Sequence, residues 1–503
     1  MTQRLLQKKC SGRSAWMLCG ISLLLLSGCT VGPDFVRPKI PPVDHYNHGQ
    51  DPAETVPTEG QSQRFEQGVG PVANWWKLFN SKQLDAAVAE GLTNNPSLEA
   101  AQANLRQSND NLQAGYGIFY PQISADFSPT RQKYSPARIG SSAPGSIFNL
   151  VTLSASISYP LDLFGAEHRA IENLQSQVDL QRSTVLGTYL ALSGNIVNTT
   201  IAMAAYQDEI KYTEQLIALL KDQIAITEKQ TEAGVVSYEA VLSLRSQLAS
   251  LEATLPPLRQ RVNQSEHLLA TLAGHAPSEW TPAEVSMAEL SLPSKLPLSL
   301  PSELLRQRPD ILVAEAQLHS ASANIGVATA AQFPSFTLNG TFGQNASSMN
   351  GLFGSNANFW SLGADLATPL FNGGTLSSRK QAAVDAYQQS QALYRQTVLA
   401  AFAQVADAVR ALEHDAETMQ AETQSVQTSE EALRLTQINY QAGLINYLQV
   451  LAADIQYHQA KLGYLQAQAQ RLQDTTALFV SLGGGWWNAT DALGNPNRPL
   501  PNK

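Results

Sequence analysis

The chain is poor in cysteine, in positive charge and in long apolar runs, and each shortage excludes a class of protein. Only three cysteines occur among 503 residues. Cys10 and Cys19 lie in a leader that we expect to be removed, so the mature chain can form no internal disulfide. Asp and Glu outnumber Lys and Arg by 42 to 33, which argues against nucleic acid and against a basic patch on an anionic membrane. Beyond the leader, no segment approaches the roughly 20 continuous apolar residues of a spanning helix, which leaves a lipid anchor, β-strands or both as the means of meeting a membrane.

Catalytic signatures are also missing. The eight histidines are scattered, and His45 and His48 lie in a proline-rich arm. No His-Glu-x-x-His pair, Gly-x-Ser-x-Gly elbow or glycine-rich phosphate loop occurs. With no positioned nucleophile or metal to argue from, we expect no enzyme activity, no metal and no bound cofactor.

Residues 1–28 have the features of a signal peptide. Four basic residues precede an apolar stretch at 15–26, which is too short to span a bilayer but suits a secretory signal. Leu26-Ser27-Gly28-Cys29 then resembles the lipobox of bacterial lipoproteins. Cleavage would leave Cys29 at the N-terminus, carrying acyl chains, and the loss of four basic residues would shift the formal charge from −9 to −13. Thr30 after it, rather than Asp, resembles lipoproteins sorted to the outer membrane.

Two runs of apolar residues at seven-residue spacing dominate the rest of the chain. One ends at Ala233-Gly234 and the other at Ala442-Gly443, and each member of the first lies 209 positions before its counterpart. The members are Tyr189, Ile196, Met203, Ile210, Ile217 and Ile224, and then Val398, Val405, Leu412, Met419, Val426 and Leu433. Sustained heptads predict long helices packed as in a coiled coil. Taken alone, they fit the core of an ordinary helical bundle equally well.

The duplication divides the chain into two similar halves. We expect a lipidated extended arm over 29–74, a first repeat over 75–276, a proline-rich linker over 277–301, a second repeat over 302–483 and a polar tail over 484–503. The first repeat is predicted to hold a leading helix, strands at about 120–128 and 150–159, a long helix at 165–233 and a return helix at 237–272. The second is predicted to hold a leading helix, strands at about 335–342 and 360–367, a long helix at 374–442 and a return helix at 446–482.

The four predicted strands alternate strictly between apolar and polar residues. Ile123, Ala125 and Phe127 alternate with Ser124 and Asp126, and the strands have the roughly 9 to 11 residues that cross a bilayer at a tilt. Their polar faces are small enough to leave a lumen. Aromatic residues cluster where strands meet helices, as a girdle at a membrane interface requires: Phe119, Tyr120, Tyr159, Phe164, Phe333 and Phe371. The alternative is a soluble sandwich with one wet face.

Four strands cannot close into a barrel, so the barrel must be shared among chains. Open edges in hydrocarbon would cost tens of kcal/mol. Two chains would give eight strands with a filled interior, whereas three give twelve and leave a passage. The long helix rises roughly 100 Å, which the return and leading helices together nearly match. We therefore predict a mixed α/β membrane protein with two internal repeats. In the homotrimer, a twelve-stranded transmembrane β-barrel, four strands per chain, is continuous with a long α-helical coiled-coil barrel.

Several motifs now combine into a resemblance. They are Val31-Gly32-Pro33-Asp34-Phe35-Val36-Arg37-Pro38, Trp75-Trp76-Lys77-Leu78-Phe79, the two Ala-Gly turns and Leu482-Gly483-Gly484-Gly485-Trp486. With the duplicated plan, they resemble the TolC-type outer-membrane channel family over essentially the whole mature chain, and above all its lipoprotein branch, which includes OprM and NodT-like proteins. The resemblance implies the outer-membrane exit duct of a tripartite efflux system, with its helical tunnel in the periplasm, passively conducting drugs or other small molecules. The implied partners are a periplasmic adaptor, an inner-membrane pump of the RND or MFS type and outer-membrane lipid.

The two turns are the first candidate site. Gly234 and Gly443 can take the left-handed conformation that ends a helix, and Ser237 and Asn446 can cap the next one. Apolar residues stand between them at the extreme tip of each hairpin, namely Val235 and Val236 in the first turn and Leu444 and Ile445 in the second. Exposed apolar patches commonly mark interfaces, so we favour adaptor docking over mutual packing around a closed tip.

The start of the second return helix is the candidate gate. In the family, this segment often places a leucine and carboxylates inward to constrict the closed channel. Leu448 matches the leucine, and Asp454 follows, but the usual acidic positions are Gln449 and Ala452 here. An acidic constriction is therefore in doubt, whereas a ring of leucines can still gate by dewetting.

The alternative function is a lipid-anchored periplasmic adaptor with coiled-coil hairpins, which would lack four amphipathic strands flanked by aromatics.

Replacing the cysteine of the lipobox tests the anchor. Cys29→Ala should abolish metabolic labelling with radioactive palmitate and retention of the anchor in the detergent phase, because no other group in the mature chain is proposed to carry acyl chains. Labelling of the variant at the wild-type level would contradict the lipobox assignment.

Overall fold

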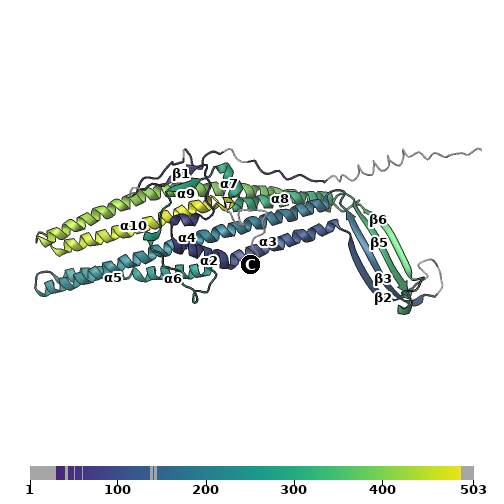
Figure 1. Ribbon diagram of the computed structural model, residues 1–503, viewed down its shortest axis with the longest axis horizontal. Helices are drawn as coiled ribbons and strands as arrows, with labels where there is room; N and C mark the ends of the chain where they lie inside the picture. The colour runs from purple at the N-terminus through teal and green to yellow at the C-terminus, as the bar shows by residue number, and fades with distance from the viewer. Residues whose placement is uncertain are drawn as a thin grey trace, which may run out of the picture. The chain divides into compact units, whose positions relative to one another are not determined.

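The computed structural model describes residues 30–39, 43–49, 51–58, 61–135, 140 and 144–488 (Figure 1). The predicted signal peptide 1–28, the predicted lipidation site Cys29 and the tail beyond 488 lie outside the described residues. The chain forms two compact units. Unit 1 comprises Met1–Arg37, Arg106–Asp179 and Glu315–Leu393, and unit 2 comprises Pro38–Leu105, Leu180–Ala314 and Tyr394–Lys503. Each unit draws on both halves of the sequence, so the compact units do not coincide with the predicted repeats.

Most of the described chain is helical, and it also contains six β-strands. The α-helices are α2 (Lys82–Asn94), α3 (Pro96–Gly115), α4 (Ala166–Glu232), α5 (Tyr238–Glu252), α6 (Leu255–Leu272), α7 (Pro301–Gln307), α8 (Pro309–Ala330), α9 (Thr375–Gln441) and α10 (Tyr447–Ser481). The strands are β1 (Arg64–Gln67), β2 (Gln122–Tyr134), β3 (Ser146–Leu161), β4 (Lys295–Leu298), β5 (Ser335–Ala346) and β6 (Asn358–Ala367). The 3-10 turns are η1 (Trp75–Phe79), η2 (Tyr116–Phe119), η4 (Met287–Glu289), η5 (Met349–Gly351) and η6 (Trp486–Asn488).

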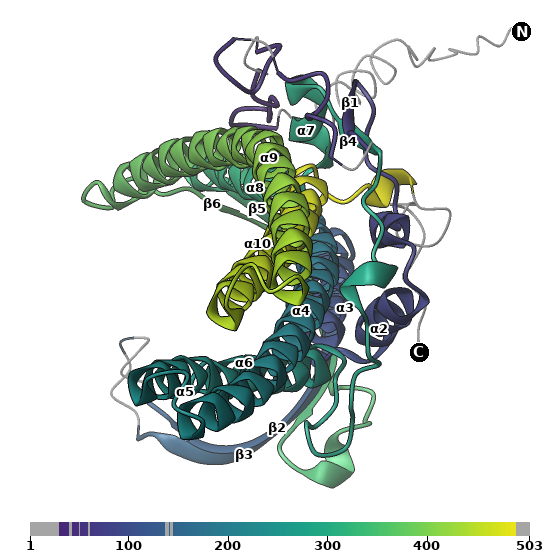
Figure 2. The same cartoon turned by 90° about the vertical axis from the view of Figure 1, so that its left-hand side faces the viewer.

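Unit 1 is built on a curved antiparallel sheet in the order β2-β3-β5-β6 (Figure 2). The central pair joins the two halves of the sequence, because β3 lies beside β5 with Ala155 opposite Phe342. The outer strands are hairpin partners, β2 with β3 and β5 with β6. This pairing across the halves is the physical reason that unit 1 takes segments from both repeats.

The register keeps the alternating apolar residues on one face of the sheet. Ile157 lies opposite Ile123 on one side and Gly340 on the other, and Gly340 lies opposite Leu362. The apolar side chains of this face are exposed, with 75% of Ile123 and 82% of Leu362 accessible. On the opposite face the hydroxyls of Ser124 and Ser156 share a 2.8 Å hydrogen bond. The alternation read from the sequence therefore produces an amphipathic sheet.

All four strands are longer than predicted. β2 reaches Tyr134 rather than residue 128, because backbone pairing with the start of β3 continues after the apolar alternation ends. Pro129 is tolerated since β2 lies at an edge of the sheet, where one row of N–H groups has no strand to bond. Pro160 lies inside β3, opposite Thr337, beyond the last residue of β3 that pairs with β2. Prolines that we took as strand ends are therefore compatible with the ladder.

The aromatic residues expected between strands and helices fall into two groups. The rings of Phe164 and Phe333 stack at 4.7 Å, which closes the junction of the sheet with α4 and α8. Tyr120 and Phe371, by contrast, are 68% and 92% exposed. Exposed aromatic rings beside an amphipathic sheet suit a membrane interface.

The N-terminal arm is seated on α4 through a buried arginine. Arg169 is 5% exposed, and its guanidinium donates to the backbone oxygen of Val31 and, at 2.7 Å, to Oδ1 of Asp34. It also donates to Oε2 of Glu172 at 2.6 Å. A buried charge needs such partners, because an unpaired one is strongly destabilising. The first turn of α4 therefore fixes the start of the described chain.

Close backbone contact with α8 also holds the N-terminal arm in place. Gly32 has a φ of +95°, and a Cβ there would come within 2.5 Å of the Cα of Gly326 on α8. The ring of Phe35 stacks on His319 at 4.2 Å, and His319 contacts Glu172 at 2.8 Å. The Gly-Pro-Asp-Phe sequence of the arm is thus a packing motif that requires a glycine at its first position.

The two long helices, α4 and α9, have 67 residues each and begin and end within one residue of the predicted bounds. Most members of both heptad runs are buried, including Ile196 at 1% and Met203 at 1%. In unit 2, Leu216 and Leu220 of α4 pack with Leu244 of α5 and Leu451 of α10. Ile224, a member of the first heptad run, belongs to the same cluster, which joins α4 and α5 to α10.

The first return helix is interrupted, contrary to the single helix predicted over 237–272. α5 ends at Glu252, and α6 begins at Leu255 with proline in its first turn. Pro256 and Pro257 lack the N–H groups that would continue the ladder, and the ring of a proline clashes with the preceding turn. The second return helix contains no proline and runs unbroken as α10.

The arm, the linker and the start of the tail are more ordered than predicted. β1 of the arm pairs in parallel with β4 of the linker, with Phe65 opposite Leu296. In the tail, Nε1 of Trp486 donates to the backbone oxygen of Gln307 at 2.8 Å. Among the described residues, no helix combines the length and the apolar character needed to cross a membrane.

Candidate functional site

The two candidate turns lie at the same end of unit 2 and have the same backbone geometry (Figure 1). Gly234 has a φ of +73° and Gly443 a φ of +71°. The N–H of Val235 donates to the oxygen of Gln230, and the N–H of Leu444 donates to that of Asn439, both at 2.9 Å. These bonds, which span five residues, are those of a Schellman ending, which closes a helix with a left-handed residue. The prediction that both glycines are left-handed is confirmed.

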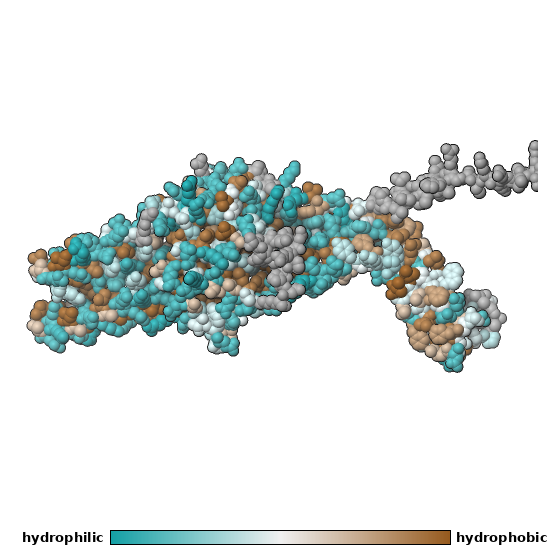
Figure 3. Space-filling model, viewed as in Figure 1, coloured by the Kyte–Doolittle hydropathy of each residue, from teal (hydrophilic) through white to brown (hydrophobic). Residues whose placement is uncertain are grey.

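Apolar side chains project from both turns. Val235 and Leu444 are each 73% exposed, while Val236 and Ile445 are half-buried. Figure 3 shows apolar side chains gathered at this end of the unit. One large side chain per turn is therefore presented outward on a rigid hydrogen-bonded loop.

The two caps differ although their positions correspond. Asn446 caps α10, because its side chain accepts a hydrogen bond from the N–H of Gln449. Ser237 occupies the equivalent position before α5, but its hydroxyl makes no capping hydrogen bond. The predicted side-chain cap is thus confirmed for Asn446 and wrong for Ser237, whose backbone oxygen instead accepts from Ala240.

The structure separates the four candidate gate residues into two groups. Leu448 is 50% exposed, and Gln449 and Ala452 are also exposed. Asp454 is half-buried and lies 3.7 Å from Nε2 of His458 one turn later. The one carboxylate of the set is thus directed toward a histidine of its own helix.

Burial dominates the electrostatics of this pair. It raises the pKa of Asp454 and lowers the pKa of His458, in each case against the opposing effect of the partner. Nδ1 of His458 is buried and has no hydrogen-bond partner among the described residues. The sequence pattern did not single out His458, although its spacing of four from Asp454 on a helix places the two side chains together.

Sequence reasoning also missed a polar cluster that fastens the arm to α10. Arg471 is 2% exposed and donates to Oε1 of Gln63 and to the hydroxyls of Thr58 and Thr55. Its nearest carboxylate is Asp415 on α9, and burial lowers the pKa of Arg471. The partners are about 410 positions apart in the sequence, so no local pattern could have joined them.

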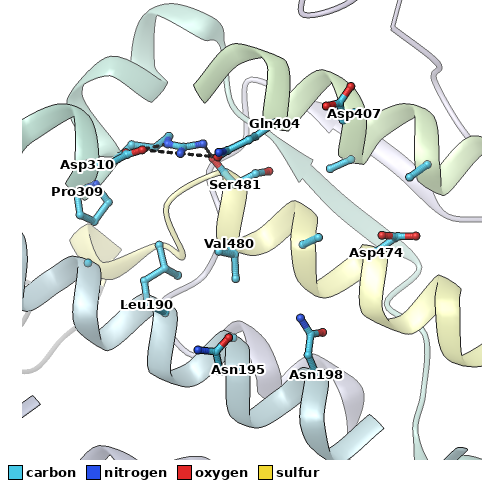
Figure 4. A pocket seen from close by; sticks show the side chains of 17 residues that line it. Leu190, Asn195, Asn198, Pro309, Asp310, Gln404, Asp407, Asp474, Val480 and Ser481 are labelled. Carbon is cyan, nitrogen blue, oxygen red and sulfur yellow. Dashed lines mark hydrogen bonds and ion pairs between the residues drawn. The ribbon is translucent and has the colours of Figure 1, made fainter. Parts of the chain in front are cut away.

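A cavity of about 610 Å³ lies between α4, α8, α9 and α10 in unit 2 (Figure 4). Small residues such as Gly187, Gly194 and Ala477 leave the space open. At one end Arg308, which is 6% exposed, donates to Asp310, to Gln404 at 2.7 Å and to the backbone oxygen of Ser481 at 2.9 Å. The volume falls within the range of small-molecule sites. No group of three or more His, Cys, Asp or Glu side chains in the described part of the chain is placed to hold a metal ion.

Long paired helices, an amphipathic antiparallel sheet and two matching apolar turns define a membrane-channel class of protein. The family model of the outer membrane efflux proteins matches residues 87–275 and 300–484, and this chain belongs to that family.

Individual relatives agree with this assignment. The pyoverdine export outer membrane protein OpmQ of Pseudomonas putida is 29% identical over 420 residues, covering 83% of this chain and 89% of the relative. Nodulation protein T of Rhizobium leguminosarum bv. viciae is 28% identical over 470 residues, covering 92% of both. The solved structure of the outer-membrane channel OprN matches with a TM-score of 0.81 and 26% identity, covering 91% of this chain and 100% of that one.

These findings confirm the predicted family and function. The chain is the outer-membrane channel of a tripartite efflux system, with its helical part in the periplasm, and the family consists of ducts rather than enzymes. The alternative of a periplasmic adaptor is not favoured, because both the sequence relatives and the structural neighbours are outer-membrane proteins.

The difference between the caps predicts a difference in tip stability. Asn446→Ala should destabilise the first turn of α10 by about 1 kcal/mol, because it removes the acceptor for Gln449 N–H. Ser237→Ala should leave the first turn of α5 nearly unchanged. Hydrogen exchange of tip peptides in the two variants measures both effects, and equal loss of protection would contradict the assignment.

Proposed function

We propose that the chain acts as a homotrimer in which twelve strands form a transmembrane barrel and the paired helices form a continuous periplasmic tunnel. The described sheet supports this proposal. Its one apolar face is exposed, and β2 and β6 each have a strand on one side only. Unpaired edges are not stable in hydrocarbon, so further strands must complete the sheet. Three copies give the smallest closed set with room for a passage.

Cys29 is the proposed lipid attachment site. It lies outside the described residues, but the next residue, Thr30, packs against Gly165 at the start of α4, where a Cβ on the glycine would come within 2.5 Å of Thr30. This contact lies in unit 1, which also holds the amphipathic sheet. An acyl chain on Cys29 would therefore enter the same outer membrane as the strands. We propose no other cofactor.

The turns are the proposed docking site for a periplasmic adaptor. An inner-membrane pump of the RND or MFS type would supply the energy for export. Two observations support docking. Both turns present one strongly exposed apolar residue, and both hold it on the same hydrogen-bonded backbone. The full set proposed to contact the adaptor is Gly234, Val235, Val236, Ser237, Gly443, Leu444, Ile445 and Asn446.

The gate is proposed to close by dewetting rather than by charge. Leu448 is half exposed, and its neighbours Gln449 and Ala452 carry no charge. Asp454 is half-buried beside His458 rather than fully exposed. A ring of three leucines across a narrow passage would exclude water without a bound ion.

Small molecules are the proposed cargo. The relatives of this chain include pyoverdine export, toluene efflux and antibiotic efflux proteins. A duct lined by the small polar face of the sheet would conduct such compounds passively, and antibiotic resistance is a proposed consequence.

Changing the turns tests docking. Val235→Asp and Leu444→Asp together should reduce recovery of the adaptor in cross-linked pull-downs by about tenfold or more, because a carboxylate cannot be buried in an apolar contact without a partner. Leu300→Asp is the control, since Leu300 is 44% exposed and lies in the linker. Normal adaptor recovery with the double variant would contradict the docking site. This measurement does not test trimer formation.

Conductance tests both the trimer and the gate. The purified protein should run as a heat-resistant trimer and conduct ions in planar bilayers, and Leu448→Ala should raise the closed-state conductance because the dewetted constriction widens. Leu268→Ala is the control, because Leu268 is a leucine of similar exposure (48%) that lies on α6 rather than in the candidate gate. A water-soluble monomer would contradict the barrel, whereas unchanged closed-state conductance would remove only Leu448 from the gate.

A further inference from the structure

Two carboxylates at the cavity in unit 2 have no basic partner among the described residues. The one basic side chain at its wall, Arg308, is already bonded to Asp310, Gln404 and backbone oxygens. Asp474 accepts a 2.8 Å hydrogen bond from the amide of Gln470, and Asp407 is exposed. Both line the cavity. Its unbalanced charge is therefore negative.

An amide on the opposite wall also lacks a donor. Oδ1 of Asn198 on α4 is buried and accepts no hydrogen bond from the described chain. Figure 4 shows this side chain turned toward α10, the helix that carries Asp474. A buried carbonyl oxygen without a donor is unfavourable, and an N–H of a ligand, or a polarised C–H of a methyl group on a quaternary ammonium, would satisfy it. The rest of the wall is largely small and apolar, with Ala191, Ala408 and Val480.

Asp474 is also half of a carboxylate pair. Its side chain contacts that of Asp415 on α9, and burial, followed by this contact, raises the pKa of Asp415 to about 7. Oδ2 of Asp415 is buried without any donor from the described chain. The charged groups that face Asp415 are Asp474 and Arg471 from α10 and His414 from its own helix. Two carboxyl groups in contact are most stable when they share one proton.

We propose that this cavity is a binding site for a small organic cation, with Asp474 and Asp407 as its counter-charges. The apolar wall takes the hydrocarbon part of the ligand, and the two carboxylates and the Asn198 oxygen take its cationic head. The volume of about 610 Å³ accommodates a compound with one aromatic ring and a quaternary or protonated amine. The proposal rests on the geometry of unit 2 and goes beyond the proposed docking, gating and trimer formation.

Occupancy of the site is coupled to the proton of the carboxylate pair. A cation beside Asp474 also stabilises the ionised form of the neighbouring Asp415, so the proton held by Asp415 leaves for the solvent. No bond in the ligand changes. Binding near neutral pH should therefore release up to about one proton for each cation bound.

Isothermal titration calorimetry with benzyltrimethylammonium tests the site on the full-length protein in detergent. We expect saturable binding with one site per chain. Asp474→Asn and Asp407→Asn should each weaken binding about tenfold, and the double variant should abolish it. Asp385→Asn is the matched control, because Asp385 is an acid on α9 that does not line the cavity. Phenylmethanesulfonate, which has a similar shape and the opposite charge, should not bind.

The proton is tested by repeating the titration at pH 7 in phosphate and in MOPS, whose heats of ionisation differ and neither of which carries a net positive charge. The apparent binding enthalpy of the wild type should depend on the buffer. Asp415→Asn should still bind the cation but should lose this buffer dependence. Equal binding by the wild type and the folded Asp407→Asn/Asp474→Asn variant, or equal binding of the sulfonate, would overturn the proposal. Failure of this test leaves the conductance assay of the duct unaffected.

Discussion

The pairing of backbone groups at the two edges of the sheet is the constraint on which the rest depends. Within the described chain, β2 and β6 each have a neighbour on one side, while the apolar face of the sheet is exposed. Neither feature suits a water-soluble monomer: the apolar face belongs in hydrocarbon, and hydrocarbon does not tolerate free N–H and C=O groups. In the proposed trimer, a single chain is therefore an incomplete part whose folding is finished by association.

The internal duplication gives the chain two copies of the same helices, turns and strands, and the two copies have diverged. Both long helices end in the same left-handed turn, yet only one of the following caps uses its side chain. Both return helices start at the same place, yet Pro256 and Pro257 break only the first. The divergence lies in loops, caps and return helices, whereas the paired strands and the two 67-residue helices keep a common plan. In the proposed trimer, these constant elements are the ones that must match around a closed tube.

Periodicity made most of this fold predictable from the sequence. The heptads gave the long helices to within one residue, because they mark a buried seam, and the alternation gave the two faces of the sheet, because successive side chains of a strand point to opposite faces. Strand ends were less accurate, since the ladder beyond residue 128 depends on backbone pairing that leaves no side-chain signal. The break between α5 and α6 had a visible signal in Pro256 and Pro257, which the prediction of one continuous return helix over 237–272 did not use. Asp415 with Asp474, Arg471 with Gln63, and β1 with β4 could not be found, because their members meet only after folding.

The buried seat of the N-terminal arm has a mechanical consequence. Val31 bonds backbone to backbone with Phe164, Arg169 gathers the oxygens of Val31 and Asp34, and Gly32 touches Gly326. A force on the N-terminal end of the arm, such as a lipid anchor in a fluid bilayer would exert, is therefore transmitted to the start of α4 within a few residues. With a lipid on Cys29, as proposed, the membrane anchor would be coupled directly to the start of α4, one of the two 67-residue helices.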